Sequence, residues 1–181
     1  MDATAPIPSI IPDLSDLGAL RTPFAIVGGV ATTLYMPQRL TQDLDILVVV
    51  ADATRLSHEL EELGATRRGD LSIGGSSWES PNGLALDVLE SAAPWARDAV
   101  AHPVRTSGGW PVIDLPYLVV LKMEASRERD LSDVAAMLAH ADEPALAAVR
   151  AVVDRYLPDA AEDLESLRAI GVLERQAREQ E

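Results

Sequence analysis

Hydrophobic positions recur along the chain with two different periods, which predict strands mixed with helices up to about residue 113 and helices alone after it. Short apolar runs predict strands at 24–27, 43–50, 65–68, 71–79 and 84–89, and a small edge hairpin at 104–106 and 112–113. Apolar residues at helical spacing predict helices at 13–20, 30–36, 51–63 and 95–101, followed by helices from 114 to 180. We therefore expect an α/β (α+β) fold, a small mixed sheet flanked by helices with a C-terminal helical segment.

The strand at 43–50 carries two carboxylates in an otherwise apolar run. Asp43 and Asp45 are two residues apart, so their side chains lie on the same face of the strand. Like charges this close destabilise one another unless a cation lies between them, and oxygen ligands suit Mg²⁺ or Mn²⁺. The alternative is a strand end at which both carboxylates meet water.

A glycine pair separates the first predicted strand from the helix that follows it. Gly28 and Gly29 come directly after the strand at 24–27, and Pro37 ends the helix. A strand, a glycine turn and a helix can bring bare amide N–H groups close to a phosphate, although a tight turn alone also uses glycines. Arg39 and Thr41 alternate with the two carboxylates, and Arg39 either binds a phosphate or pairs with an aspartate.

A third carboxylate occupies a similar apolar strand. Asp87 lies within Leu84–Leu89, after a turn at Pro81–Gly83 that pairs this strand with its predecessor. Because side chains alternate between the two faces of a strand, Asp87 lies on a face that is partly apolar. A carboxylate without a partner is energetically costly there. It therefore joins the other two aspartates as a candidate metal ligand, or it pairs with an arginine.

The second informative stretch runs from Asp114, a predicted helix cap, to His140. It forms two amphipathic helices joined near Ser126. Lys122, the only lysine of the chain, falls in an apolar helical run and must reach water or an anion. Four charged residues follow it, and they also fit an ordinary solvated, salt-bridged face: Arg127, Arg129, Asp130 and Asp133.

Composition narrows the possible partners. The chain has 181 residues, no cysteine and a formal net charge of −14. This charge argues against broad binding to nucleic acid, which needs a basic surface. The sequence shows neither a signal peptide nor a run of membrane-spanning length, so we expect a cytoplasmic protein without a membrane partner.

The spacing of these motifs is similar to that of a known superfamily. Gly28-Gly29, thirteen residues, Asp43-Leu44-Asp45, and later Leu86-Asp87-Val88 resemble the DNA polymerase β-like nucleotidyltransferases. Within it, Arg39-x-Thr41-x-Asp43-x-Asp45 resembles the AbiEii-type branch of toxin-like and uncharacterised proteins. The stretch from Lys122 to Asp133 resembles the C-terminal motif of that branch, with Arg129 where lysine is frequent.

The resemblance implies a nucleotidyltransferase fold with an N-terminal arm and short helix (1–23), a core (24–115) and a C-terminal helical region packed on the core (116–181). It also implies that Asp43, Asp45 and Asp87 are catalytic and hold Mg²⁺ or Mn²⁺. Lys122 and Arg129 would meet the triphosphate of a bound NTP, while Asp130 and Asp133 would order either the basic residues or the wall beside the base. The remaining nucleotide- and phosphate-binding residues would be Gly28, Gly29, Arg39 and Thr41.

The implied activity is transfer of NMP from an NTP to an acceptor, which in relatives is a protein, tRNA or a small molecule. The AbiEii-type branch suggests a toxin–antitoxin or phage-defence setting with a cognate protein partner. The alternative is a non-catalytic nucleotide-binding or antitoxin-like protein that keeps the fold, or a regulatory protein whose helical tail is the functional surface. The three carboxylates favour the enzyme.

Overall fold

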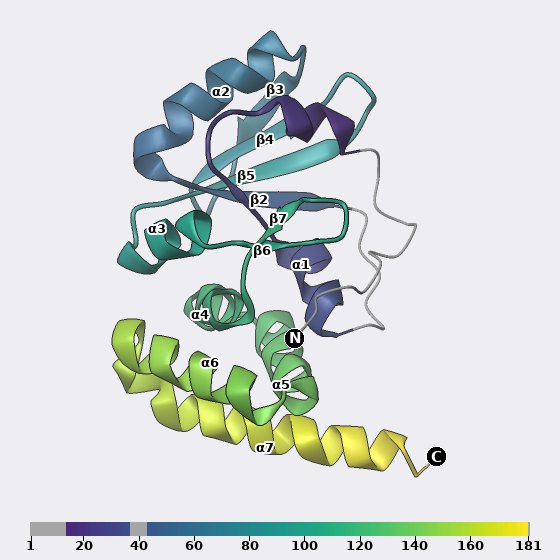
Figure 1. Cartoon of the computed structure of the whole chain (residues 1–181), viewed down its shortest axis with the longest axis vertical. Coiled ribbons are helices and arrows are strands. Elements are labelled where there is room, and N and C mark those ends of the chain that lie inside the picture. Colours follow the sequence, from purple (N-terminus) through teal and green to yellow (C-terminus); the bar gives the residue numbers. More distant parts are fainter. Residues whose placement is uncertain (1–13, 37–42, 181) are drawn as a thin grey trace. The chain divides into compact units, whose positions relative to one another are not determined.

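The computed structural model describes residues 14–36 and 43–180, which form two compact units. Of these residues, 14–34 and 43–113 belong to the first unit, and 35–36 and 114–180 belong to the second. Strands lie in the first unit, and the second is helical (Figure 1). The predicted α/β fold, with a mixed sheet flanked by helices and a C-terminal helical segment, is confirmed.

Within the described residues the first unit holds one seven-stranded sheet in the order β3-β4-β5-β2-β1-β7-β6. β2 pairs antiparallel with β1 and parallel with β5, so the sheet is mixed. The strands are β1 (Ala25–Val27), β2 (Leu44–Val49), β3 (Thr66–Asp70), β4 (Gly75–Glu79), β5 (Ala85–Ser91), β6 (Val104–Arg105) and β7 (Pro111–Val112). The helical segments are η1 (Ser15–Ala19), α1 (Gly28–Tyr35), η2 (Val50–Asp52), α2 (Ala53–Glu62) and α3 (Pro94–Ala101).

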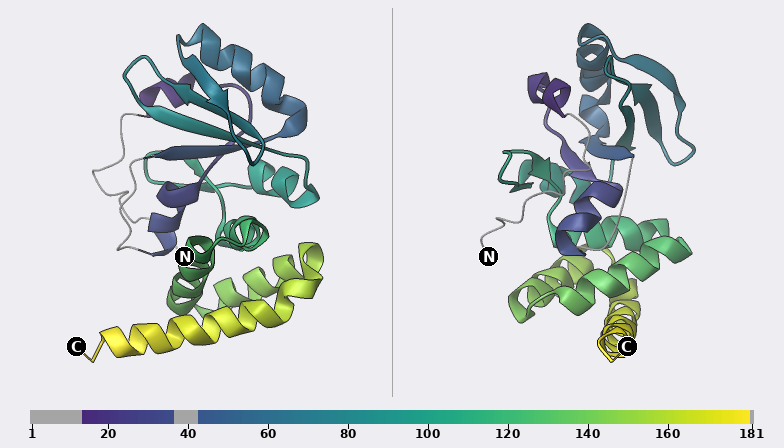
Figure 2. Two further views of the ribbon diagram at one scale, coloured as in Figure 1. Left: turned by 180° about the vertical axis from the view of Figure 1, so that it is seen from behind. Right: turned by 90° about the vertical axis from the view of Figure 1, so that its right-hand side faces the viewer.

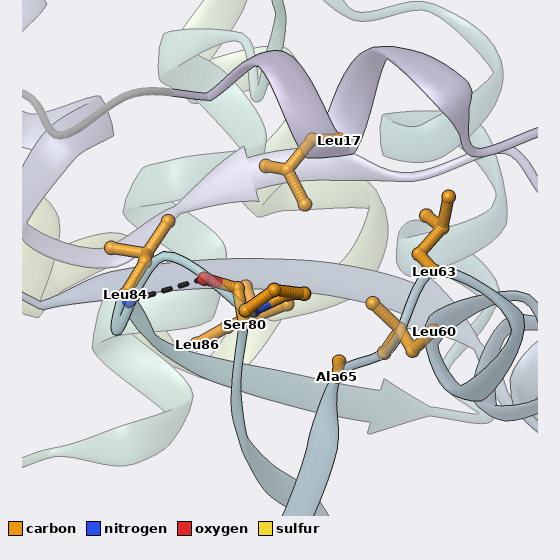
Figure 3. A pocket seen from close by; sticks show the side chains of 8 residues that line it. Leu17, Leu60, Leu63, Ala65, Ser80, Leu84 and Leu86 are labelled. Carbon is orange, nitrogen blue, oxygen red and sulfur yellow. Dashed lines mark hydrogen bonds between the residues drawn. The ribbon is translucent and has the colours of Figure 1, made fainter.

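One face of the sheet forms the core of this unit. Leu44, Ile46 and Val48 of β2 are fully buried, as expected for alternate positions of a strand. Leu86 of β5 lies under η1 and α2, where apolar side chains surround a small pocket (Figure 3). The pocket has a cavity volume of about 20 Å³, room for about one water molecule, so it is part of the core and no substrate site.

Glu59 ties α2 to the segment before β1. Its Oε2 accepts hydrogen bonds from the backbone N–H groups of Arg21 (2.8 Å) and Thr22 (3.0 Å). Burial alone would raise the pKa of Glu59, but these two N–H groups, together with the Thr22 hydroxyl and the charge of Arg21, outweigh it and hold the pKa below its ordinary value.

The second unit consists of α4 (Leu115–Ala125), α5 (Glu128–His140), α6 (Glu143–Tyr156), η3 (Pro158–Ala160) and α7 (Ala161–Arg178). α4 packs on α6, and α7 packs along α5 and α6 (Figure 2). The backbones of α7 and α5 are in contact at Gly171, where an added methyl group would lie 1.9 Å from the carbonyl oxygen of Ala135. No helix in the described part of the chain is both long and apolar enough to cross a membrane.

Two predicted elements differ from the structure. The strand predicted at 71–79 begins only at Gly75, because residues 71–74 form a turn in which Gly74 has φ +93°. The short helix predicted at 13–20 is the 3₁₀ segment η1. The predicted hairpin is formed by β6 and β7, and β7 also pairs with β1.

Candidate functional site

The glycine turn and the first aspartate strand meet at Gly28 and Asp45. Gly28 follows β1 directly, opens α1 and has φ +59°, a conformation that favours glycine. A methyl group on its Cα would lie 1.9 Å from Asp45 Oδ2 and 2.6 Å from Asp45 Cγ. The carboxylate of Asp45 therefore lies against the bare Cα of Gly28, at the first turn of α1. Gly29 follows within the helix and is buried.

Asp45 and Asp87 are direct neighbours in the sheet. β2 and β5 run parallel, and their register pairs Asp45 with Asp87. Paired residues on adjacent strands point to the same face and lie about 5 Å apart. Both side chains are half-buried. The register thus brings together two predicted site residues that are separated by more than forty positions in sequence.

The face that carries these carboxylates changes from exposed to buried along the strands. Ala85 of β5 is exposed, Asp87 is half-buried, and Leu47, in the next pair along β2, is fully buried. Asp43 is exposed, directly before β2, on the open side. The carboxylate pair therefore lies at the border between solvent and core, where a ligand can reach it while the local dielectric is lowered.

The donor set of this face fits a hard divalent cation. In the described part of the chain no group of three or more His, Cys, Asp or Glu side chains is arranged to hold a metal ion by itself. A magnesium ion that accompanies a nucleotide commonly takes one or two carboxylates and draws its other ligands from phosphate and water. Asp45 and Asp87 offer two such carboxylates, with Asp43 beside them at the strand entry.

Three of the predicted C-terminal site residues form a charged cluster in the second unit: Lys122, Asp130 and Asp133. Lys122 is 4% exposed, and its Nζ lies 3.0 Å from Asp130 Oδ1 and 2.7 Å from Asp133 Oδ2. Arg127 Nε lies 3.0 Å from the other oxygen of Asp130. The two ion pairs of Lys122 join α4 to α5 across Ser126, a non-glycine residue with φ +50°.

Arg129 differs from Lys122 in its surroundings. Its side chain is exposed and forms no hydrogen bond or ion pair with any described residue. Lys122 is paired with the buried carboxylate of Asp133 and the half-buried carboxylate of Asp130, whereas the exposed Arg129 can contact an external anion. The structure therefore brings Lys122, Asp130 and Asp133 together and leaves Arg129 outside the cluster.

α4 begins at a second polar contact in this unit. Asp114 caps the helix by accepting a hydrogen bond from the N–H of Leu115 (2.8 Å). Tyr35 also bonds to Asp114. Burial, followed by the negative charge of Asp114, raises the pKa of Tyr35 well above its ordinary range, so its phenol stays protonated and donates this bond.

Two predicted site residues, Arg39 and Thr41, lie outside the described residues. Two residues of the carboxylate face were missed by the sequence interpretation. Ser77 of β4 pairs with Asp87, and Gly69 of β3 pairs with Ser77. Counting back through the turn at Pro81–Gly83 places position 77 opposite Asp87, so the signal was present in the hairpin spacing.

The chain matches no protein-family model and no curated protein. It is similar to a solved structure of the antibiotic-resistance factor ANT(2'')-Ia, with 18% identity over 92% of this chain and 91% of that chain and a TM-score of 0.46. It is also similar to ANT(2'')-Ia in complex with adenylyl-2''-tobramycin, with 20% identity over 90% of this chain and 94% of that chain and a TM-score of 0.46. A third likeness, to a CCA-adding enzyme with CTP, has 15% identity, a TM-score of 0.40, and covers 86% of this chain and 46% of that one.

These solved structures are of nucleotidyltransferases.

Proposed function

We propose that this chain is a metal-dependent nucleotidyltransferase, which transfers NMP from an NTP to an acceptor hydroxyl and releases pyrophosphate. The observation that carries the proposal is the pairing of Asp45 with Asp87, with the Asp45 carboxylate held against Gly28 at the start of α1. Two adjacent half-buried carboxylates repel each other, and this arrangement is favourable when a divalent cation lies between them. Beside them, the first turn of α1 offers backbone N–H groups to a phosphate.

The predicted site residues of the first unit have separate roles in this reaction. Asp43, Asp45 and Asp87 would hold Mg²⁺ or Mn²⁺, and Gly28 and Gly29 would present N–H groups to the triphosphate. The metal, when bound, neutralises phosphate charge and makes a hydroxyl more acidic. The acceptor oxygen forms a bond to the α-phosphorus, and the bond from that phosphorus to the bridging oxygen of the leaving pyrophosphate breaks. The hydroxyl proton passes to the carboxylate of Asp87 and from there to water.

The C-terminal cluster supports the nucleotide in this proposal. The resemblance to the AbiEii-type motif would assign both Lys122 and Arg129 to the triphosphate, and Asp130 and Asp133 to ordering the basic residues or the wall beside the base. The burial of Lys122 and its two short ion pairs favour different roles for Lys122 and Arg129. Arg129 is the cation that binds phosphate, while Lys122 holds the segment that carries Arg129. By the same resemblance, Arg39 and Thr41 contribute to phosphate binding.

The net charge of −14 favours a neutral or cationic acceptor over a nucleic acid. A hydroxyl of a small molecule or of a protein side chain meets this condition. The resemblance to the AbiEii-type branch makes a protein acceptor, a toxin–antitoxin setting and a cognate partner part of the proposal.

The test is calorimetric titration of each NTP, with Mg²⁺, into the wild type and into Asp45→Asn and Asp87→Asn variants. Magnesium-dependent binding in the wild type that both substitutions abolish supports the proposal and identifies the base. Asp70→Asn is the matched control, because Asp70 pairs with Ser76, a buried residue of the opposite face, and is itself exposed. Absence of binding in the wild type at millimolar NTP contradicts the proposal.

A further inference from the structure

The row of site residues continues beyond Asp87 into β4. The register pairs Ser77 with Asp87 on one side and with Gly69 of β3 on the other. Asp45, Asp87, Ser77 and Gly69 therefore lie side by side across four adjacent strands and share one face of the sheet. The chain places a carboxylate pair, a hydroxyl and a bare backbone in one line.

Ser77 is set apart from its neighbour Ser76. Ser76 faces the core, is 3% exposed, and its Oγ accepts a hydrogen bond from Trp78 Nε1 at 2.8 Å. Ser77 is half-buried on the carboxylate face, and its hydroxyl bonds to no residue in the described part of the chain. Its Cβ lies about 5 Å from that of Asp87, so one bridging oxygen atom can contact both side chains.

Gly69 leaves open space at the end of the row. A methyl group on its Cα would meet no atom within 4 Å, in contrast to Gly28, where it would collide with Asp45. The chain next to Ser77 is thus accessible from the side of β3, and a side chain introduced at position 69 has room without disturbing its surroundings.

We propose that Ser77 binds the attacking oxygen of the acceptor beside Asp87, and that acceptors larger than water approach over Gly69. This inference rests on the proposed function. The Ser77 hydroxyl hydrogen-bonds the acceptor oxygen and holds it between Ser77 and Asp87. The acceptor oxygen then bonds to the α-phosphorus, its proton moves to Asp87, and pyrophosphate leaves with the electron pair of the broken P–O bond. Ser77 is chemically unchanged by the reaction, and its role is to fix the position of the attacking oxygen.

The test measures turnover of the full chain with Mg²⁺ and the NTP that the wild type binds, with water as the acceptor and NMP as the product. Ser77→Ala is expected to lower kcat about 2- to 12-fold, the effect of one hydrogen bond, with the KM for Mg–NTP unchanged. Ser77→Thr keeps a hydroxyl and restores kcat. Ser72→Ala, in the exposed turn before β4, is the control and leaves both constants unchanged.

A second measurement adds glycerol and compares the glyceryl ester of NMP with free NMP. Gly69→Val is expected to lower the ratio of ester to NMP, because its side chain fills the approach while water still reaches Ser77. An unchanged ratio, or no ester with the wild type, overturns the approach over Gly69.

The outcomes separate this inference from the proposed function. Equal kcat values for the wild type and Ser77→Ala, or a change in KM alone, overturn the role of Ser77. If the wild type binds Mg–NTP but releases no NMP, the role of Ser77 is also overturned, because water should occupy the position of the acceptor oxygen. The proposed nucleotide site is not contradicted by that result. A wild type that binds no Mg–NTP removes both proposals.

Discussion

Replacement of Gly28 by alanine tests the contact on which the candidate site depends. The new methyl group would lie 1.9 Å from Asp45 Oδ2, 2.6 Å from Cγ and 3.0 Å from Cβ, all distances at which something must move. The backbone φ of +59° adds a second cost, because an L-residue is disfavoured there. We expect Gly28→Ala to destabilise the protein and to displace the Asp45 carboxylate.

The two costs can be assigned magnitudes. The left-handed backbone conformation costs about 1–2 kcal/mol for alanine. Forcing an extra carbon into a filled site costs typically about 1–3 kcal/mol more. The free energy of unfolding should therefore fall by roughly 2–5 kcal/mol, measured by urea denaturation of the full chain. Magnesium-dependent NTP binding should be lost at the same time, because Asp45 no longer lies beside Asp87.

Gly83→Ala is the matched control for the backbone term. Gly83 has φ +82°, and a methyl group there meets nothing within 4 Å, so only the conformational cost of about 1–2 kcal/mol remains. The collision term is isolated by repeating Gly28→Ala in an Asp45→Ala background, which removes the two closest atoms. The reasoning is refuted if Gly28→Ala costs the same in both backgrounds and no more than Gly83→Ala.

Three further predictions concern charge. Asp87→Asn should raise the unfolding free energy in EDTA by about 0.2–1 kcal/mol, because it relieves the repulsion from Asp45, although NTP binding is lost; a lower stability contradicts this. Lys122→Met should cost about 3–5 kcal/mol because it removes the cation from the buried carboxylate of Asp133, while the half-buried Asp130 keeps its ion pair with Arg127; Arg129→Met should change stability by less than about 0.5 kcal/mol, and thermal denaturation of both variants measures the difference. Glu59→Gln should cost about 1–3 kcal/mol. Because the pKa of Glu59 is lowered on folding, its contribution is complete above its ordinary value of 4.5 and disappears as the pH falls through the folded pKa, so the variant and the wild type should converge in stability in acid.

Local sequence pattern predicted most elements of this fold. The apolar run at 43–50 predicted a buried strand, and the alternation at 84–89 predicted a strand with Leu86 and Val88 on one face; the burial of Leu44, Ile46, Leu86 and Val88 agrees with both. Asp114 predicted the start of α4, and its side chain caps that helix. These signals are local, because a strand period or a cap depends on neighbours a few residues away.

The pairing of strands could not be predicted in the same way. The local sequence at 43–50 does not indicate that β2 lies beside β5 with Asp45 opposite Asp87, because α2, β3 and β4 lie between the two strands in sequence. Likewise, the lysine in an apolar helical run required an anion, but its choice of Asp130 and Asp133 depended on how α5 turns back after Ser126. Such contacts depend on tertiary packing, which pattern alone does not specify.

The register between β2 and β5 links the stability of the core to the chemistry of the site. A slip of one residue would turn Asp45 toward the core and expose Ile46, exchanging a half-buried carboxylate for a fully buried apolar residue. Burial of a carboxylate in the apolar core is far more costly than its present position at the border with solvent. The apolar residues on the core face therefore hold Asp45 and Asp87 in one row without touching any ligand. For the same reason Ile46, which lies on the opposite face, should influence nucleotide binding when its replacement by a polar residue weakens the register.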